Sequence, residues 1–200
     1  MYRFLFSFLR HPIATGAIAP SGVHLARAMV DWIDWKAVGS CAELGPGTGA
    51  FTPSILSSMN PGTDFFAVEL NKAFAATMAE RFPDVDTYCR SVADIRQICN
   101  ERGLSKIDCM VCGLPWAAFP SELQRSLMDA VRSCLSEDGY FCTFAYLQGT
   151  VLPAGVRFQR LLRQSFSSVR RGRIVWRNLP PAFVYQCRPT VGGQISFPEP

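Results

Sequence analysis

The chain has 200 residues, of which 48% are hydrophobic and 18% are charged, and its formal net charge is +4. This composition suits one folded domain with a sizeable core and excludes a disordered, low-complexity or repetitive chain. The positive charge lies in residues 151–200, which hold eight arginines and one acidic residue, Glu199, and this excess favours either an anionic partner (phosphate, nucleic acid or an acidic membrane surface) or a solvated basic face.

Residues 1–20 are predicted to form an N-terminal segment of their own. The opening stretch, MYRFLFSFLRHP, is apolar and aromatic with flanking arginines, and it is too short to cross a membrane. Arg10 and Pro20 also argue against a secretory signal. The segment is expected either to lie in a lipid interface as an amphipathic helix or to pack on the domain. The predicted location is the cytoplasm, with a peripheral position on the inner membrane face in the first case.

Residues 21–200 are predicted to alternate strands with helices, starting with a helix after the capping signal Pro20-Ser21. The later helices are expected at 51–59, 71–81 (capped by Asn71), 94–102, 121–135 (capped by Ser121) and 157–166. The strands are expected at 39–45, 64–70, 85–91, 107–114 and 139–147.

The end of the chain breaks this alternation. Residues 168–178 and 182–188 read as two strands joined by a short connection without a helix, which predicts an antiparallel hairpin at the sheet edge. On the first of these strands, Arg171 and Arg173 are expected on one face, with Ile174 and Trp176 on the other. The predicted fold class is α/β, with a doubly wound, mostly parallel seven-stranded sheet and an antiparallel C-terminal hairpin.

The eight cysteines lie mostly among apolar residues on predicted strands, where a free thiol behaves as a small hydrophobic side chain. This setting predicts reduced cysteines. Cys109 and Cys112 have the spacing of a metal-binding pair, but residues three apart on a strand point to opposite faces. No metal is therefore predicted.

A glycine-rich turn follows the first predicted strand, with Gly45, Gly47 and Gly49 in the string AELGPGTGAFT. Such a turn lies at the carboxyl end of its strand, where doubly wound sheets bind ligands. The third glycine comes too early for the dinucleotide fingerprint G-x-G-x-x-G, and no Gly-Lys-Ser/Thr follows, as a nucleotide triphosphate loop requires.

Acidic residues stand at the ends of the first three predicted strands. Glu43 precedes the turn and suits a cationic ligand better than a pyrophosphate, because like charges repel. Glu69, with Leu70 beside it, is placed to accept hydrogen bonds from the ribose hydroxyls of an adenosine, and Asp94 to reach the adenine amino group. S-adenosylmethionine is cationic and has no phosphate, so it is the predicted ligand.

This set resembles the class I S-adenosylmethionine-dependent methyltransferases over nearly the whole chain. Several strings are similar to the bacterial phospholipid N-methyltransferases of the PmtA type: HPIATGAIAPSG, AELGPGTGAFT, CGLPWAAFP and VRRGRIVWRNLPPAFVYQCR. The resemblance implies a Rossmann-like methyltransferase fold, a stretch around Ser21 that folds over the donor, and a membrane-docking helix at residues 2–10. It also implies an N-methyltransferase whose substrate is the amino headgroup of phosphatidylethanolamine-type phospholipids.

The resemblance also assigns the methyl-accepting side of the site. Methyltransferases of exocyclic amines carry a polar residue followed by Pro/Leu-Pro-aromatic, which holds the amine. Here Gly113 takes the leading position, followed by Leu114, Pro115 and Trp116, so the side-chain acceptor is missing. Tyr146 is expected as a helper at the end of the fifth strand, and the Trp116 ring could hold a methylated ammonium by cation–π attraction.

Arginines suit the phosphate of such a lipid, and Arg171 and Arg173 are the predicted contacts. The predicted partners are a phospholipid or another amine substrate and an anionic membrane surface, with nucleic acid less favoured. Two alternatives stay open: an RNA-adenine or small-molecule amine methyltransferase, and a catalytically inactive donor-binding module at a membrane.

Overall fold

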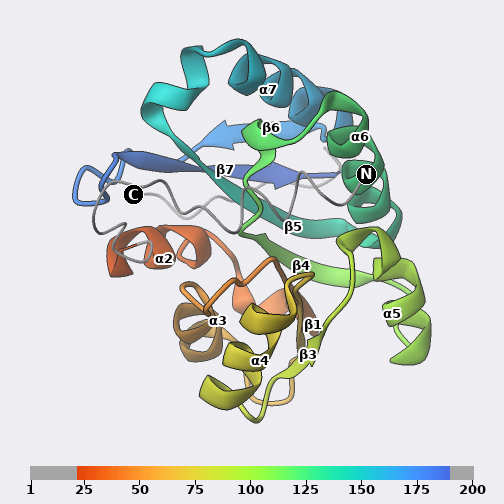
Figure 1. Ribbon diagram of the computed structural model, residues 1–200. Helices are drawn as coiled ribbons and strands as arrows, with labels where there is room; N and C mark the ends of the chain where they lie inside the picture. Colours follow the sequence, from red (N-terminus) through yellow and green to blue (C-terminus); the bar gives the residue numbers. More distant parts are fainter. Residues whose placement is uncertain (1–21, 190–200) are drawn as a thin grey trace.

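The computed structural model describes residues 22–189, which fold into one seven-stranded sheet with helices on both faces (Figure 1). The strand order is β3-β2-β1-β4-β5-β7-β6, and β7 runs antiparallel to both of its neighbours. The strands are β1 (Ser40–Leu44), β2 (Asp64–Val68), β3 (Asp86–Tyr88), β4 (Ile107–Cys112), β5 (Leu135–Tyr146), β6 (Ser168–Arg171) and β7 (Ala182–Arg188). The predicted fold class is therefore confirmed.

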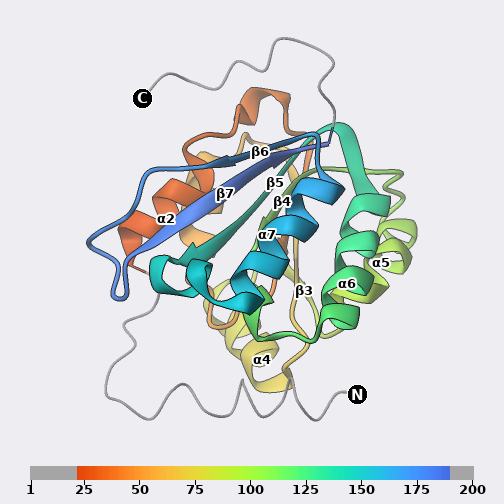
Figure 2. The same cartoon turned by 90° about the horizontal axis from the view of Figure 1, so that it is seen from above.

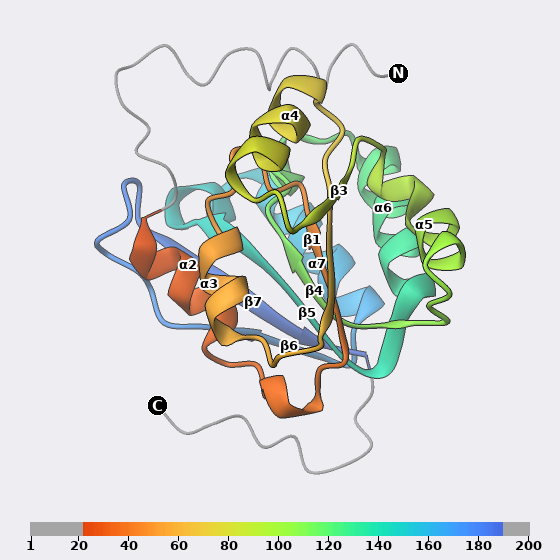
Figure 3. The ribbon, with the colours of Figure 1, turned by 90° about the horizontal axis from the view of Figure 1, so that it is seen from below.

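Within residues 22–189, three helices cover each face of the sheet, and each buries apolar side chains in the core. One face carries α5 (Ile95–Glu101), α6 (Ser121–Cys134) and α7 (Pro153–Ser165), and Figure 2 shows α6 and α7 from this side. The other carries α2 (Val23–Val30), α3 (Thr52–Ser58) and α4 (Lys72–Arg81), seen in Figure 3. Short 3₁₀ turns join these elements: η1 (Trp35–Ala37), η2 (Val92–Asp94), η3 (Trp116–Ala118) and η4 (Leu147–Val151).

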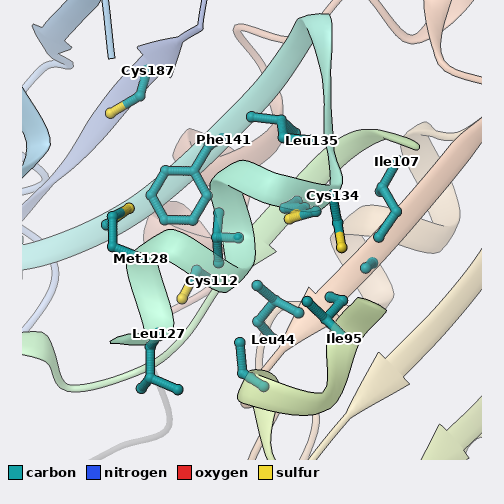
Figure 4. Close-up of a cluster of buried hydrophobic side chains, with 14 of the residues drawn as sticks. Leu44, Ile95, Ile107, Cys112, Leu127, Met128, Cys134, Leu135, Phe141 and Cys187 are labelled. Carbon is teal, nitrogen blue, oxygen red and sulfur yellow. The ribbon is translucent and has the colours of Figure 1, made fainter. Parts of the chain in front are cut away.

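The core under α6 shows why this sequence forms a helix there. Leu127, Met128, Val131 and Cys134 recur at helical spacing and are buried against the central strands. Figure 4 shows Leu127, Met128 and Cys134 in this layer with Leu44, Cys112 and Phe141 of the sheet. Each such apolar side chain contributes about 1.5–3 kcal/mol when fully buried.

Several boundaries differ from the sequence-based expectation, among them those of α6, β5, α7 and β3. The N-cap of α6 is Pro120 rather than Ser121, and no side-chain capping bond forms there. The strand β5 starts at Leu135, four residues early, because the chain passes from α6 straight into the sheet. The helix α7 starts at Pro153, four residues early, since proline suits the first helical position. The strand β3 is shorter than predicted.

The C-terminal hairpin forms, but a bulge interrupts its first strand. Arg171 pairs with Tyr185, whereas Val175 forms an isolated bridge with Ala182. One extra residue therefore lies between these two pairs on the β6 side. We expected Arg171 and Arg173 on one face of a regular strand and Ile174 and Trp176 on the other. That expectation is wrong, because the bulge shifts the register by one residue between Arg171 and Val175.

The helix α2 begins at Val23 after the N-cap Gly22. The expected membrane-contacting segment 1–20 and Ser21 lie outside the described residues. Cys109 and Cys112 pack into different core layers on opposite faces of the sheet, as predicted. Within residues 22–189, no helix is long and apolar enough to span a bilayer, and no three metal-ligating side chains come together.

Candidate active site

The glycine turn lies where the chain reverses its order of strands, between β1 and β4. From β1 the sheet extends outward through β2 and β3, and then resumes on the other side with β4. Backbone hydrogen bonds join the strand ends at this point: the Gly45 N–H donates to the Val68 oxygen (2.9 Å), and the Gly113 N–H donates to the Leu44 oxygen (2.8 Å). This is the position at which doubly wound sheets bind ligands.

All three glycines of the turn have positive φ: Gly45 (+70°), Gly47 (+60°) and Gly49 (+83°). A Cβ at Gly45 would lie 2.6 Å from the Leu114 side chain, and one at Gly49 would lie 2.4 Å from the Phe82 ring. At Gly47, in contrast, nothing lies within 4 Å of the position that a Cβ would occupy. Packing therefore requires Gly45 and Gly49, while Gly47 presents its backbone to open space, where a ligand can approach closely.

Glu69 ties the glycine turn to the end of β2. Its carboxylate accepts hydrogen bonds from the Gly47 N–H (3.0 Å) and the Asn71 N–H (2.8 Å), and only 5% of the residue is exposed. Burial raises the pKa of Glu69, and these backbone bonds counteract the rise. A carboxylate has about four lone-pair sites, so these backbone bonds leave capacity to accept a hydrogen bond from a ligand hydroxyl group. Leu70 lies beside it, half-buried.

Glu43 lies at the end of β1 and is fully buried. The Thr52 hydroxyl donates to its Oε2 (2.7 Å), while its Oε1 has no partner within residues 22–189. Burial raises the pKa of Glu43 to about 8, although the Thr52 bond lowers it. An unpartnered buried carboxyl oxygen two residues before the turn fits a ligand that brings a positive charge and does not fit a pyrophosphate.

Replacing Glu43 with Gln is expected to remove a pH dependence. A cation beside Glu43 favours its charged form, so binding of S-adenosylhomocysteine, the demethylated donor, should release about one proton at pH 7. Calorimetry in buffers of different ionisation enthalpy measures this number, and Glu43→Gln should bring it close to zero. Because the folded-state pKa lies above the ordinary 4.5, the ligand-free protein should also lose stability as pH rises from about 4.5 to 8, and Glu43→Gln should lose less. Equal proton release by both forms would contradict this role.

The segment after β4 closes the other side of the turn. A Cβ on Gly113 would lie 2.6 Å from the Gly45 carbonyl oxygen, far inside an ordinary contact. The absence of a polar side chain at Gly113 therefore follows from the close approach of two backbone segments. It gives no reason to infer an inactive protein.

Trp116 is a core residue, so its expected role is wrong. It is 2% exposed, and its ring stacks on Phe158 with centroids 5.0 Å apart and planes 13° apart. No open ring face is left on which an ammonium could lie. The Trp116 N–H donates to the Leu114 carbonyl oxygen (2.9 Å), and the Gln124 side chain donates to the Trp116 carbonyl oxygen (2.6 Å).

Tyr146 ends β5 at the same edge of the sheet. The residue is half-buried and packs edge-on against Phe144, and no partner for its hydroxyl is found within residues 22–189. Burial raises the pKa of Tyr146. The phenol is therefore neutral near pH 7 and can donate or accept one hydrogen bond.

The remaining predicted residues, Asp94, Arg171 and Arg173, have no hydrogen bond or ion pair with the glycine turn within residues 22–189. Asp94 is exposed at the start of α5, after β3. Arg171 lies over the rings of Phe183 and Tyr185 on β7, at the far side of the sheet. Arg173 is exposed and forms no ion pair within residues 22–189.

Sequence reasoning missed two contacts that shape the turn. Thr52 opens α3 and donates to the Glu43 carboxyl group, and the available signal was a hydroxyl three residues after Gly49. Arg81, in the last turn of α4, donates to the Thr48 carbonyl oxygen. Nothing in its sequence position indicated that contact.

No protein-family model matches the chain. A curated relative, the ornithine lipid N-methyltransferase of Singulisphaera acidiphila, is 36% identical over 192 residues, which cover 94% of this chain and 95% of the relative. The chain belongs to the family of S-adenosylmethionine-dependent lipid N-methyltransferases. The predicted enzyme class and methyl donor are confirmed, while the phosphatidylethanolamine substrate stays a prediction.

Solved structures support the fold of this lipid N-methyltransferase. Human methyltransferase-like protein 13, in complex with S-adenosylhomocysteine (SAH), aligns with a TM-score of 0.64 at 13% identity over 88% of this chain and 84% of that one. The N-methyltransferase NodS of Bradyrhizobium japonicum, also with SAH, aligns with a TM-score of 0.61 at 13% identity over 83% of this chain and 84% of that one. Both share the Rossmann-like methyltransferase fold.

Proposed function

We propose that this enzyme methylates the headgroup amine of a membrane lipid, with an ornithine lipid as the first candidate. The observation that carries the proposal is the relative that acts on ornithine lipid and aligns with 94% of the chain. Phosphatidylethanolamine is the second candidate. It is favoured by the strings that resemble phospholipid N-methyltransferases and by the arginine excess near the C-terminus.

The residues around the turn would hold the donor by complementary charge and hydrogen bonding. S-adenosylmethionine supplies a methyl group on a sulfonium for transfer to an amine nitrogen. Glu43, with its unpartnered buried oxygen, would hold the positive end of the ligand. Glu69 would accept hydrogen bonds from hydroxyl groups while it holds the Gly47 N–H. Leu70 and Asp94 would contact the nucleobase.

The accepting amine must be neutral and correctly oriented. The Gly113 carbonyl accepts no backbone hydrogen bond within residues 22–189, whereas the Leu114 carbonyl accepts one from Trp116 (2.9 Å). The Gly113 carbonyl is therefore available to accept a hydrogen from the amine and direct its lone pair. The Tyr146 hydroxyl would accept or donate a second bond, and water would take the proton. Positioning of this kind supplies most of the rate in such a reaction.

The two candidate headgroups differ in the anion next to the amine. An ornithine headgroup carries a carboxylate, and phosphatidylethanolamine carries a phosphate. Arginine pairs with either anion through two parallel hydrogen bonds, so Arg173 is a candidate contact in both cases. Arg171 would need to leave the aromatic rings that it covers.

Competition between the two lipids tests the proposal. The enzyme is incubated with methyl-labelled donor and mixed vesicles that contain equal amounts of ornithine lipid and phosphatidylethanolamine. We expect the ornithine lipid to be labelled at least about tenfold faster than phosphatidylethanolamine. A difference of about 1.4 kcal/mol in activation free energy between the two lipids suffices for that ratio. Preferential labelling of phosphatidylethanolamine would reverse the order of the candidates. Label in added RNA and in neither lipid would contradict the proposal.

A further inference from the structure

Large apolar side chains are exposed in only three segments of residues 22–189. Val23 begins α2, a second group lies at the start of α7, and a third lies in the loop between β6 and β7. We call the last two groups the apolar rim, which consists of Val151 (79% exposed), Leu152 (56%), Val156 (43%), Ile174 (37%), Trp176 (67%) and Leu179 (78%). Isolated exposed apolar residues are normal, but a concentration of them marks an interaction surface.

Hydrogen bonds hold these segments next to each other. Tyr146, at the end of β5, pairs with Ala182 at the start of β7, and the Leu147 N–H donates to the Pro181 oxygen (2.8 Å). The turn η4, which leads to Val151, thus adjoins the loop between β6 and β7. Figure 2 shows this loop beside the start of α2, and the segment between β5 and α7 next to the start of β7.

Hydrogen bonds of a buried side chain hold the loop between β6 and β7 in place. The Asn178 side chain is buried (4% exposed), accepts a hydrogen bond from the Gly22 N–H (3.0 Å) and donates to the Pro180 oxygen (2.7 Å). Because Asn178 points inward, Trp176 and Leu179 on either side of it are presented to the outside. The backbone that carries the exposed Trp176 side chain is therefore held in place by the hydrogen bonds of Asn178.

The charged residues within the two segments of the apolar rim are all cationic. Arg157 follows Val156, and Arg173 and Arg177 flank the stretch Ile174–Trp176, all of them exposed. The chain contains no aspartate or glutamate from residue 139 to residue 198. Each apolar group of the rim is therefore bordered by cations alone within its own segment.

We infer that the apolar rim is a docking surface for an anionic lipid bilayer. Tryptophan and leucine suit the boundary between headgroups and acyl chains, where arginines bind anionic headgroups. Both rim segments adjoin the carboxyl ends of the strands, on the same edge as the glycine turn and Tyr146. Docking there presents the candidate active site to the headgroup layer. The inference deepens the proposed lipid substrate by assigning the surface through which the enzyme reaches it.

Vesicle flotation without methyl donor or an aminolipid tests the surface separately from catalysis. The full chain is mixed with vesicles of phosphatidylcholine, or of equal parts phosphatidylcholine and phosphatidylglycerol. Preferential binding to the anionic vesicles is expected. Trp176→Ala should weaken that binding roughly tenfold, and the double variant Arg173→Gln/Arg177→Gln should weaken it roughly 10- to 30-fold.

A matched double variant, Lys36→Gln/Arg163→Gln, removes two exposed cations away from the rim and should bind as the parent does. Unchanged SAH binding and thermal unfolding would show that the rim variants fold. Parent-like vesicle binding by both rim variants would overturn the inference. So would a dimer of the parent that Trp176→Ala converts to a monomer, because the rim would then bind a second copy, or retention on RNA that the rim variants abolish. If the proposed function fails instead, vesicle binding persists without transfer to any lipid amine.

Discussion

Replacing Gly113 with Asn is expected to lower kcat/KM at least roughly 100-fold, although it restores the polar residue found in amine methyltransferases. Its Cβ would lie 2.6 Å from the Gly45 carbonyl oxygen, so the glycine turn and the β4 end must separate. A displacement of about 1 Å at a reacting centre costs a factor of this size. Overpacking also destabilises by about 1–3 kcal/mol. Initial rates and denaturant unfolding measure the two effects.

Gly149→Ala is the matched control, because nothing lies within 4 Å of the position of its Cβ. It should keep parent-like activity. Gly113→Ala should share most of the Asn defect, since the contact arises at Cβ. If Gly113→Asn were more active than the parent, the side chain would be a missing catalytic group and the steric explanation would be wrong.

Glu69→Ala is expected to weaken binding of SAH roughly 100-fold. The change removes the acceptor proposed for the ribose hydroxyl groups and also releases the Gly47 and Asn71 N–H groups. Hydrogen bonds to a charged group contribute about 1.5–3 kcal/mol each. Isothermal titration calorimetry measures the affinity directly.

The conservative Glu69→Gln variant separates the two roles of this residue. Its amide oxygen can still accept one N–H, so the turn should stay closer to the parent structure and the affinity should fall between those of the parent and Glu69→Ala. Asp138→Ala, which removes an exposed carboxylate at the start of β5, is the control. Parent-like SAH affinity in Glu69→Ala would disprove the carboxylate assignment.

The strands and the position of the glycine turn could be predicted because they depend on local patterns. Buried parallel strands are short apolar runs, and a glycine-rich turn after the first strand is typical of ligand-binding loops in such sheets. The start of β5 at Leu135 was not predicted, because the local pattern there is misleading. The polar run of Glu137 and Asp138 suggests a loop, but β5 begins before it and these residues are exposed near its start.

Contacts between segments that lie far apart in the chain could not be predicted from the sequence. The bulge between Arg171 and Val175 depends on the pairing with β7. The burial of Trp116 depends on Phe158, which lies on α7. The requirement for glycine at Gly113 depends on how closely the Gly45 carbonyl approaches. In each case the local residues are compatible with more than one environment, and a contact with a residue distant in the chain determines which environment forms.

Mass spectrometry of lipids extracted after incubation with the enzyme tests the central claim most directly. Vesicles containing ornithine lipid are mixed with a donor whose methyl group carries deuterium. We expect the ornithine lipid to gain intact deuterated methyl groups on its headgroup with the parent enzyme, and almost none with Glu69→Ala. A folded, SAH-binding parent enzyme that leaves both ornithine lipid and phosphatidylethanolamine without deuterium would contradict the account.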